Sequence, residues 1–430
     1  MLVTPRPCRH NIPSLLVAGS FVIMAITRSG AGSASGRSRG HTTVSALALT
    51  SGKKTYQRKK KTTAKEPPLL LSASAGRNPV GRTKTATTAI SNSGDAIAAA
   101  SNGSRTTAND DDILFALSDD VVMGELRKRP SQRNKSPYVG DVWLDNEQRE
   151  AIVHLPNLDM GGKCVPGAKL LMKPARDKKG NLVGKDAVNP KYGTPKCEFI
   201  AQLLRVDESD LSSIYEPTWV GAHPSLGEKI AEQLVSRNLL GTNFPKVQSF
   251  KREVSNVGGT DMRADFLIQH EDPSLPPRLL EVKTVVDTDY SIAAVPDRDK
   301  CVFTSYQKPY TRTGIFPWGN GSQKGPEGEA VVSARAIKHV RELTRMVQER
   351  PQRFDATILF VVIRHDAKAF RPNRDACPSF VRYLKEAKEA GVQVLAKQVR
   401  WGEEDAEAGE ARGKLVGKCF EGDLLDVVWP

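Results

Sequence analysis

The run 356–364 constrains the fold of this chain more than any other segment. It reads ATILFVVIR, a continuous apolar stretch with the length of a strand rather than of a helix. A strand that is apolar on both faces has to be covered on both, as happens in a sheet flanked by helices. Helical patterns at 333–349 and 379–390 flank it, and a further strand pattern follows at 392–399. This strand–helix–strand order predicts parallel pairing in a mixed α/β layer.

Charge is distributed unevenly along the 430 residues. The chain has 63 Lys and Arg against 49 Asp and Glu, a formal net charge of +14. Residues 1–94 hold 15 of these bases and one acid, Glu66, so the other 336 residues hold 48 bases and 48 acids. Because this body is neutral, its contact with a polyanion would require a local cluster of bases rather than an overall excess.

Residues 1–94 are typical of a targeting leader. An apolar segment at 12–26 follows two early arginines and precedes a basic tract rich in Ser and Thr. With 15 residues the apolar segment is too short to span a bilayer, so we expect no membrane association of the mature protein. The pattern favours import into an organelle, a plastid rather than a mitochondrion, while the basic run 58–61 leaves the nucleus open and the cytoplasm is a further alternative. Residues 95–112 are polar and read as a linker.

The first part of the body, residues 113–222, is predicted to be a small β-barrel or sandwich. Short apolar pieces are separated by Gly and Pro, which is typical of strands joined by turns. The predicted strands are 138–144, 150–155, 168–172 and 198–206.

The second part, residues 223–402, has a pattern of predicted helices and strands that is typical of an α/β domain. A helix is predicted from Ser225 to about Asn238, and two strands, 264–270 and 278–285, are predicted to form a hairpin. Residues 286–330 read as a loop-like insertion and residues 403–430 as a tail.

Most common catalytic motifs are missing from the sequence. It has no GxxxxGK[ST] phosphate loop, no HExxH and no GxSxG, and its six cysteines include no CxxC pair that would indicate a zinc site. The predicted hairpin carries the remaining candidate. Glu281 and Lys283 are two apart and therefore share one face of their strand, and Asp265 on the other strand can converge on them.

Two carboxylates are the minimum protein contribution to a Mg²⁺ site, with Mn²⁺ as an alternative ion, because the remaining ligands can come from water and phosphate. We therefore predict Asp265 and Glu281 as metal ligands, Lys283 as a catalytic group that holds the attacking water, and Glu253 as a further catalytic acid. The alternative is an ordinary cross-strand ion pair between Glu281 and Lys283.

Local clusters of bases supply the candidates for phosphate contact. One lies at the entrance of the barrel and another on the helix at 333–349. The predicted nucleic-acid-binding residues are Arg127, Lys128, Arg129, His154, Asn157, Arg263, Lys338 and His339.

These pieces together resemble one family, the sugar fermentation stimulation proteins, from about residue 124 to about residue 397. The motifs that carry the resemblance occur in the same order and spacing. They are HLPN at 154–157, VPG at 165–167, RADF at 263–266, EVK at 281–283, GIFP at 314–317, KHVREL at 338–343 and EAKEAGV at 386–392.

The resemblance implies an OB-like N-terminal barrel followed by a PD-(D/E)xK nuclease-like domain, a mixed sheet flanked by helices, within an α+β fold class. It implies that Asp265, Glu281 and Lys283 occupy the metal-binding acid, acid and lysine positions. It also implies DNA as the partner, single- or double-stranded, and a Mg²⁺-dependent phosphodiesterase as the candidate activity.

The sequence departs from the family pattern near the expected cleft. The family continues Phe-Pro with Asp-Ala, whereas here Trp318 and Gly319 follow Phe316-Pro317, and Glu329 is the nearest substitute for the missing acid. Two alternatives to a nuclease therefore stay open, a DNA-binding module that does not cut, and a small-molecule or protein-interaction role suggested by the neutral body.

Overall fold

The structure is a computed structural model that describes residues 113–157, 160–298, 301–402 and 415–430. The predicted leader, the linker and the acidic segment 403–413 lie outside the described residues. The described residues belong to one compact unit of the chain. Within these residues, no helix combines the length and the apolar character needed to cross a bilayer.

The first half of the fold is a closed five-stranded β-barrel. Its strands are β2 (Val122–Lys128), β3 (Val139–Leu144), β4 (Arg149–His154), β5 (Lys169–Pro174) and β6 (Phe199–Val206). They pair in the order β4-β3-β2-β5-β6, and a short parallel pairing of β4 with β6 closes the barrel. A sixth strand, β7 (Thr218–Gly221), extends it beyond β6. The sequence pattern missed β2 because its second half, ELRK, is charged.

The second half is a mixed seven-stranded sheet. In spatial order its strands are β1 (Ile113–Ala116), β20 (Lys418–Leu425), β19 (Gln393–Trp401), β17 (Asp355–Val362), β10 (Arg278–Val285), β9 (Arg263–His270) and β8 (Val247–Ser255). The predicted apolar run forms β17 at the centre, paired in parallel with β10 and β19. Barrel and flanked sheet together confirm the predicted α+β fold class.

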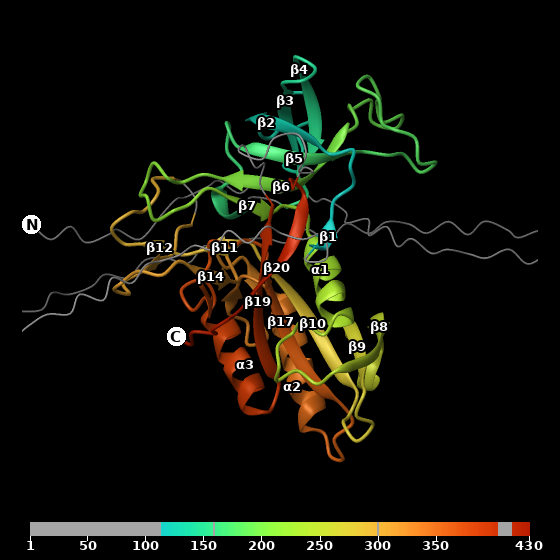
Figure 1. Cartoon of the computed structure of the whole chain (residues 1–430), viewed down its shortest axis with the longest axis vertical. Helices are drawn as coiled ribbons and strands as arrows, with labels where there is room; N and C mark the ends of the chain where they lie inside the picture. The colour runs from blue at the N-terminus through green and yellow to red at the C-terminus, as the bar shows by residue number, and fades with distance from the viewer. Residues whose placement is uncertain (1–112, 158–159, 299–300, 403–414) are drawn as a thin grey trace, which may run out of the picture. The chain divides into compact units, whose positions relative to one another are not determined.

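Three helices cover the two faces of this sheet (Figure 1). On one face α1 (Ser225–Ser236) packs with Leu359 and Val361 of β17, in the same apolar core as the barrel. On the other face α2 (Ala334–Gln348) and α3 (Pro378–Glu389) pack against Ile358 and Phe360. Each buried side chain of this size contributes about 1.5–3 kcal/mol, so the alternation along β17 holds both helical layers.

Two predicted domain limits need correction. Residues 418–425, expected in a tail, form β20 in the large sheet, and residues 113–116, expected in the barrel, form β1 and pair with β20. The two strands lie at opposite ends of the described chain, and β1 has only four residues. Their pairing depends on the edge that β19 offers, and no local pattern encodes that edge.

The predicted insertion 286–330 also differs from expectation in its first half. It contains the short strands β11 (Asp287–Thr288), β12 (Tyr290–Ser291), β13 (Thr304–Ser305), β14 (Thr313–Phe316), β15 (Gln323–Lys324) and β16 (Ala330–Val331). The strand β14 lies between β11 and β18 (Ala369–Pro372) in a small sheet of its own. The residues from Asp287 to Tyr290 are buried rather than exposed, because charged partners meet them there.

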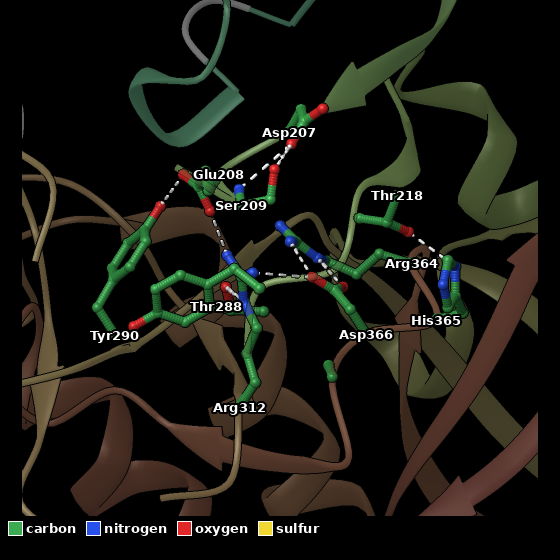
Figure 2. A network of polar contacts seen from close by, with 12 residues as sticks. Asp207, Glu208, Ser209, Thr218, Thr288, Tyr290, Arg312, Arg364, His365 and Asp366 are labelled. Carbon is green, nitrogen blue, oxygen red and sulfur yellow. Dashed lines mark hydrogen bonds and ion pairs between the residues drawn. The ribbon is translucent and has the colours of Figure 1, made fainter. Parts of the chain in front are cut away.

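Those partners form a buried polar network between barrel and sheet (Figure 2). The guanidinium of Arg312 contacts Glu208 at 2.5 Å and Asp366 at 3.1 Å. The two oxygens of Asp366 each accept a bond of 2.6 Å from Arg364, which is fully buried. Glu208 comes from the loop after β6 of the barrel and also accepts a hydrogen bond from Tyr290. These bonds hold the end of the barrel against the residues that follow β10 and β17.

Candidate functional site

The candidate site lies where the pairing of β9 with β10 ends. The ladder between these strands stops at the pair Phe266–Leu280. One residue further, the carboxylate of Asp265 accepts the backbone N–H of Val282 at 2.7 Å. The Asp265 side chain thus takes the place of a backbone acceptor, which directs its carboxyl group into the gap beside Glu281.

Glu281 and Lys283 point to the same face of β10, as the spacing of two predicted. That face is the one covered by α2 and α3. One carboxylate oxygen of Glu281, Oε1, accepts hydrogen bonds from the Lys283 ammonium and from Nδ1 of His339 on α2, the latter at 2.5 Å. The other oxygen, Oε2, is buried and has no hydrogen-bond partner among the described residues. A buried carboxylate oxygen without a donor costs free energy unless something binds it.

The two acids of the site have opposite pKa shifts. Burial, together with the neighbouring charge of Glu281, raises the pKa of Asp265 to about 6. Burial alone would also raise the pKa of Glu281, but the His339 hydrogen bond and the Lys283 charge outweigh it and lower that pKa. At neutral pH Glu281 is therefore ionised. The pKa of Asp265 is close enough to neutral pH that a fraction of its carboxyl groups is protonated.

A divalent cation bound between Asp265 and Glu281 would compensate both the unpartnered oxygen of Glu281 and the raised pKa of Asp265. It would give Oε2 of Glu281 a partner and would offset the repulsion that raises the pKa of Asp265. The described part of the chain contains no cluster of three or more His, Cys, Asp or Glu side chains placed to hold a metal. A Mg²⁺ ion at this site would be held by the carboxylates of Asp265 and Glu281, with water or phosphate in the other positions.

Glu253 and Arg263 lie beside this pair but are turned toward each other. Glu253 belongs to β8, between the residues that pair with Ala264 and Phe266, so it lies across from Asp265. Its carboxylate forms an ion pair with Arg263, and both side chains are at least half exposed. In this arrangement neither side chain points to the Asp265–Glu281 pair.

Glu329, the nearest substitute in the sequence for the acid missing after Pro317, forms a hydrogen bond within its own loop. Its carboxylate accepts the backbone N–H of Glu327 at 2.9 Å. Its other oxygen, Oε1, is buried and has no hydrogen-bond partner among the described residues.

The barrel candidates gather around the start of β3 and the end of β4. Arg129 donates to the backbone oxygens of Pro137 and Asn157, at 2.8 and 3.2 Å. His154 contacts the backbone oxygen of Tyr138 at 3.1 Å, and burial, assisted by the Arg129 charge, lowers its pKa. The structure thus brings Arg129, His154 and Asn157 together.

Two other barrel candidates lie on the surface beside this group. Arg127 and Lys128 are both exposed at the end of β2. The guanidinium of Arg127 lies 5.8 Å from the ring centre of Trp143 and pairs with Glu125 at 2.8 Å. Lys128 forms no ion pair with a carboxylate of the described residues.

The two candidates on α2 separate, although they are adjacent in sequence. Lys338 is exposed and pairs with Asp261 at 2.7 Å. His339 is buried and bonded to Glu281, so its prediction as a nucleic-acid contact is wrong. Consecutive residues of a helix differ in direction by about 100°, which is why only one of them can face solvent here. The apolar residues Ala336 and Leu343, three before and four after His339, could have indicated this buried face.

Comparison with known proteins places these residues in a family context. The family described as "Sugar fermentation stimulation protein RE domain" matches residues 330–405. A sugar fermentation stimulation protein homolog of Symbiobacterium thermophilum is 30% identical over 277 residues, which cover 64% of this chain and 89% of that protein. A homolog from Synechococcus is 24% identical and covers 67% of this chain and 91% of its own length. A homolog from Maricaulis maris is 30% identical over 181 residues, and the chain spans 60% of its length.

Among solved structures, a similar one is that of Pyrococcus furiosus SfsA in complex with Ca²⁺. The TM-score is 0.46 with 17% sequence identity, over 74% of this chain and 99% of the other.

Proposed function

Since the chain belongs to the sugar fermentation stimulation protein family, we propose that it binds DNA and cleaves it as a Mg²⁺-dependent phosphodiesterase, with Mn²⁺ able to replace Mg²⁺. The observation that carries the proposal is the meeting of Asp265, Glu281 and Lys283 where β9 and β10 separate, with one buried oxygen of Glu281 left unpartnered. Two acids and a lysine in this arrangement can bind a metal ion and a water molecule beside a phosphodiester. A surface ion pair would not require their burial.

The topology supports the same reading. The barrel order β4-β3-β2-β5-β6, with its parallel closure, is compatible with an OB-like fold, which commonly binds oligonucleotides. The succession α1, β8, β9, β10, α2, β17 supports a nuclease-like core in which the acids come from the second and third strands. Because one fold supports many functions, the site residues remain the main argument.

The roles follow from the contacts. A bound Mg²⁺ would supply Lewis-acid stabilisation of the charge that develops on the phosphoryl oxygens. Asp265 and Oε2 of Glu281 would hold the ion, while His339 fixes the other oxygen of Glu281. The Lys283 ammonium, now bonded to Glu281, would orient the attacking water and donate a hydrogen bond to it. His339 is in this scheme a positioning residue, because it acts through Glu281.

A second candidate function is DNA binding without cleavage. The absence of an acid after Phe316-Pro317 favours it, since the ion would then have only two protein ligands. We further propose an organellar location, a plastid before a mitochondrion, because the whole net positive charge of the chain lies in residues 1–94.

Incubation of the full-length protein with DNA and Mg²⁺ tests the proposal. We expect nicking of plasmid and cutting of labelled oligonucleotides with Mg²⁺ or Mn²⁺, and none in EDTA. Fluorescence anisotropy in EDTA should still detect binding. Binding at all ion concentrations without any cutting would leave only the non-cutting module, and the absence of both would reject a role in DNA metabolism.

Replacing His339 by Gln or Ala tests the positioning role. We expect the Mg²⁺ affinity to fall 10- to 100-fold, as for other residues that orient a metal ligand, with the smaller loss for Gln, which can still donate to Glu281. The measurement is the Mg²⁺ concentration needed for half-maximal thermal stabilisation, read without DNA. Gln348→Ala, at the exposed last residue of the same helix, serves as the control. Equal Mg²⁺ affinities in all variants would contradict the role.

A further inference from the structure

The positive charge of the neutral body is concentrated on two neighbouring loops of the barrel. Residues 127–138 end β2 and lead to β3, and residues 175–198 join β5 to β6. Together they hold eleven Lys and Arg but only three acids, a net charge of +8, so the rest of residues 95–430 carries a net charge of −8. We call these two segments the basic loop pair.

The two loops of this pair are in contact. The Asn134 side chain donates to the backbone oxygen of Pro195 at 3.3 Å, which links the first loop to the end of the second. The longer loop extends away from the barrel, in green in Figure 1. Isolated bridges between Arg176 and Leu182 and between Val188 and Pro195 give it internal structure.

The lysines of the longer loop are available for binding. Five of them are exposed, and within the described ranges none forms an ion pair with a carboxylate. They are Lys178, Lys179, Lys185, Lys191 and Lys196. An exposed lysine without an acidic partner can neutralise a phosphate at little desolvation cost.

Two exposed tyrosines accompany these lysines. Tyr192 is 66% exposed and lies under the ammonium of Lys191, at 5.0 Å from its ring centre. Tyr138 ends the first loop, is 42% exposed and lies against His154 with ring centres 6.5 Å apart. In a duplex the faces of the bases are covered by neighbouring base pairs, so an exposed aromatic ring cannot stack on them. Exposed rings therefore favour binding of a single strand over binding of a duplex.

We propose that the basic loop pair binds single-stranded DNA, with the lysines along the phosphates and with Tyr138 and Tyr192 stacked on bases. These loops occupy the places from which OB-like barrels bind oligonucleotides. The inference rests on the proposed function, DNA binding and cleavage, because it names single-stranded DNA as the substrate of that activity. It adds a binding surface separate from Asp265, Glu281 and Lys283.

The test measures binding of fluorescein-labelled oligo-dT and of a duplex of equal length to the full-length protein in EDTA. We expect tighter binding of the single strand. The triple variant Lys178→Gln, Lys185→Gln, Lys191→Gln should weaken it at least tenfold at low salt and make the slope of log K against log salt shallower by about 2. The matched control replaces exposed lysines elsewhere, Lys251, Lys324 and Lys388, by Gln.

The tyrosines give a second, charge-independent measurement. Tyr192→Ala should weaken single-strand binding at least fivefold without changing the salt slope, whereas Tyr192→Phe should retain binding. Equal effects of the two lysine triples, equal affinity for duplex, or equally tight binding of anionic lipid vesicles would overturn the inference. Unaltered single-strand binding with no Mg²⁺-dependent cutting would reject only the proposed catalysis, and cutting that is unaffected by the loop variants would reject only this inference.

Discussion

Asp265→Asn is expected to reduce Mg²⁺-dependent cleavage of DNA at least 100-fold while leaving DNA binding in EDTA unchanged. A factor of 100 corresponds to about 2.7 kcal/mol of lost transition-state stabilisation. The amide keeps an oxygen that can accept the Val282 N–H, so the local strand geometry is retained. It removes one of two carboxylates beside the proposed ion, which is why the Mg²⁺ requirement should rise together with the loss of rate.

Lys283→Met extends this prediction to the proposed catalytic amine. Methionine keeps most of the aliphatic volume of a side chain that is 13% exposed, but cannot donate to water or to Glu281. We expect a similar loss of cleavage with little change in the Mg²⁺ concentration for half-maximal thermal stabilisation. Glu271→Gln, an exposed acid directly after β9, is the matched control. Cleavage at the wild-type rate in Asp265→Asn would show that the activity lies elsewhere in the protein.

Asp366→Asn is expected to lower the free energy of unfolding by about 3–5 kcal/mol at pH 7, because it leaves the buried Arg364 without its carboxylate and leaves Arg312 with only one of its two, Glu208. Arg364 is fully buried and Arg312 is 5% exposed, so water cannot replace the lost partner. Urea denaturation of the full-length protein measures the change. Glu349→Gln, which removes one side of an ion pair with a half-exposed arginine, should change it by less than about 1 kcal/mol.

The effect of Asp366→Asn should depend on pH in a defined direction. Burial alone would raise the pKa of Asp366, but the charge and hydrogen bonds of Arg364 outweigh it and hold that pKa well below the usual value near 4. A depressed pKa in the folded state stabilises the protein above the unfolded-state pKa. The difference between wild type and variant should therefore be full at pH 7 and shrink as the pH falls below about 4. A constant difference from pH 7 to pH 3 would contradict this account.

Restoring apolar packing provides a further check on the network. A double variant, Arg364→Met with Asp366→Leu, removes the ion pair but still leaves Arg312 one partner, Glu208. It should be more stable than Asp366→Asn alone, because a buried pair replaced by apolar side chains costs less than a buried charge left without its partner.

Much of the fold could be predicted because the relevant signals are local. The run 356–364 became β17, the helix predicted at 333–349 became α2 at 334–348, and the predicted hairpin became β9 and β10. In each case burial determines where apolar residues occur in the segment. Burial of one face gives a regular repeat of apolar residues, and burial of both faces of a strand gives a continuous apolar run. The strands β1 and β20 gave no such signal, and their pairing joins residues from the two ends of the described chain.

The candidate site was predictable only in part for a similar reason. A spacing of two puts Glu281 and Lys283 on one face of any strand, so their proximity follows from the sequence. That Asp265 bonds to the backbone of Val282 depends on where the β9–β10 ladder ends. The role of His339 was misread as a surface contact because a histidine next to a lysine on a helix looks like part of a basic edge.

The sequence by itself determined the central strand, the three helices and the hairpin of the second part of the body, and the pairing of acid and lysine in EVK, because these depend on residues within a few positions of each other. It also determined that the body is neutral. Only the tertiary structure decided which charges are buried. It brought His339 to Glu281, Arg312 between Glu208 and Asp366, and one basic loop against another, since residues far apart in the chain meet only once the strands and helices have packed.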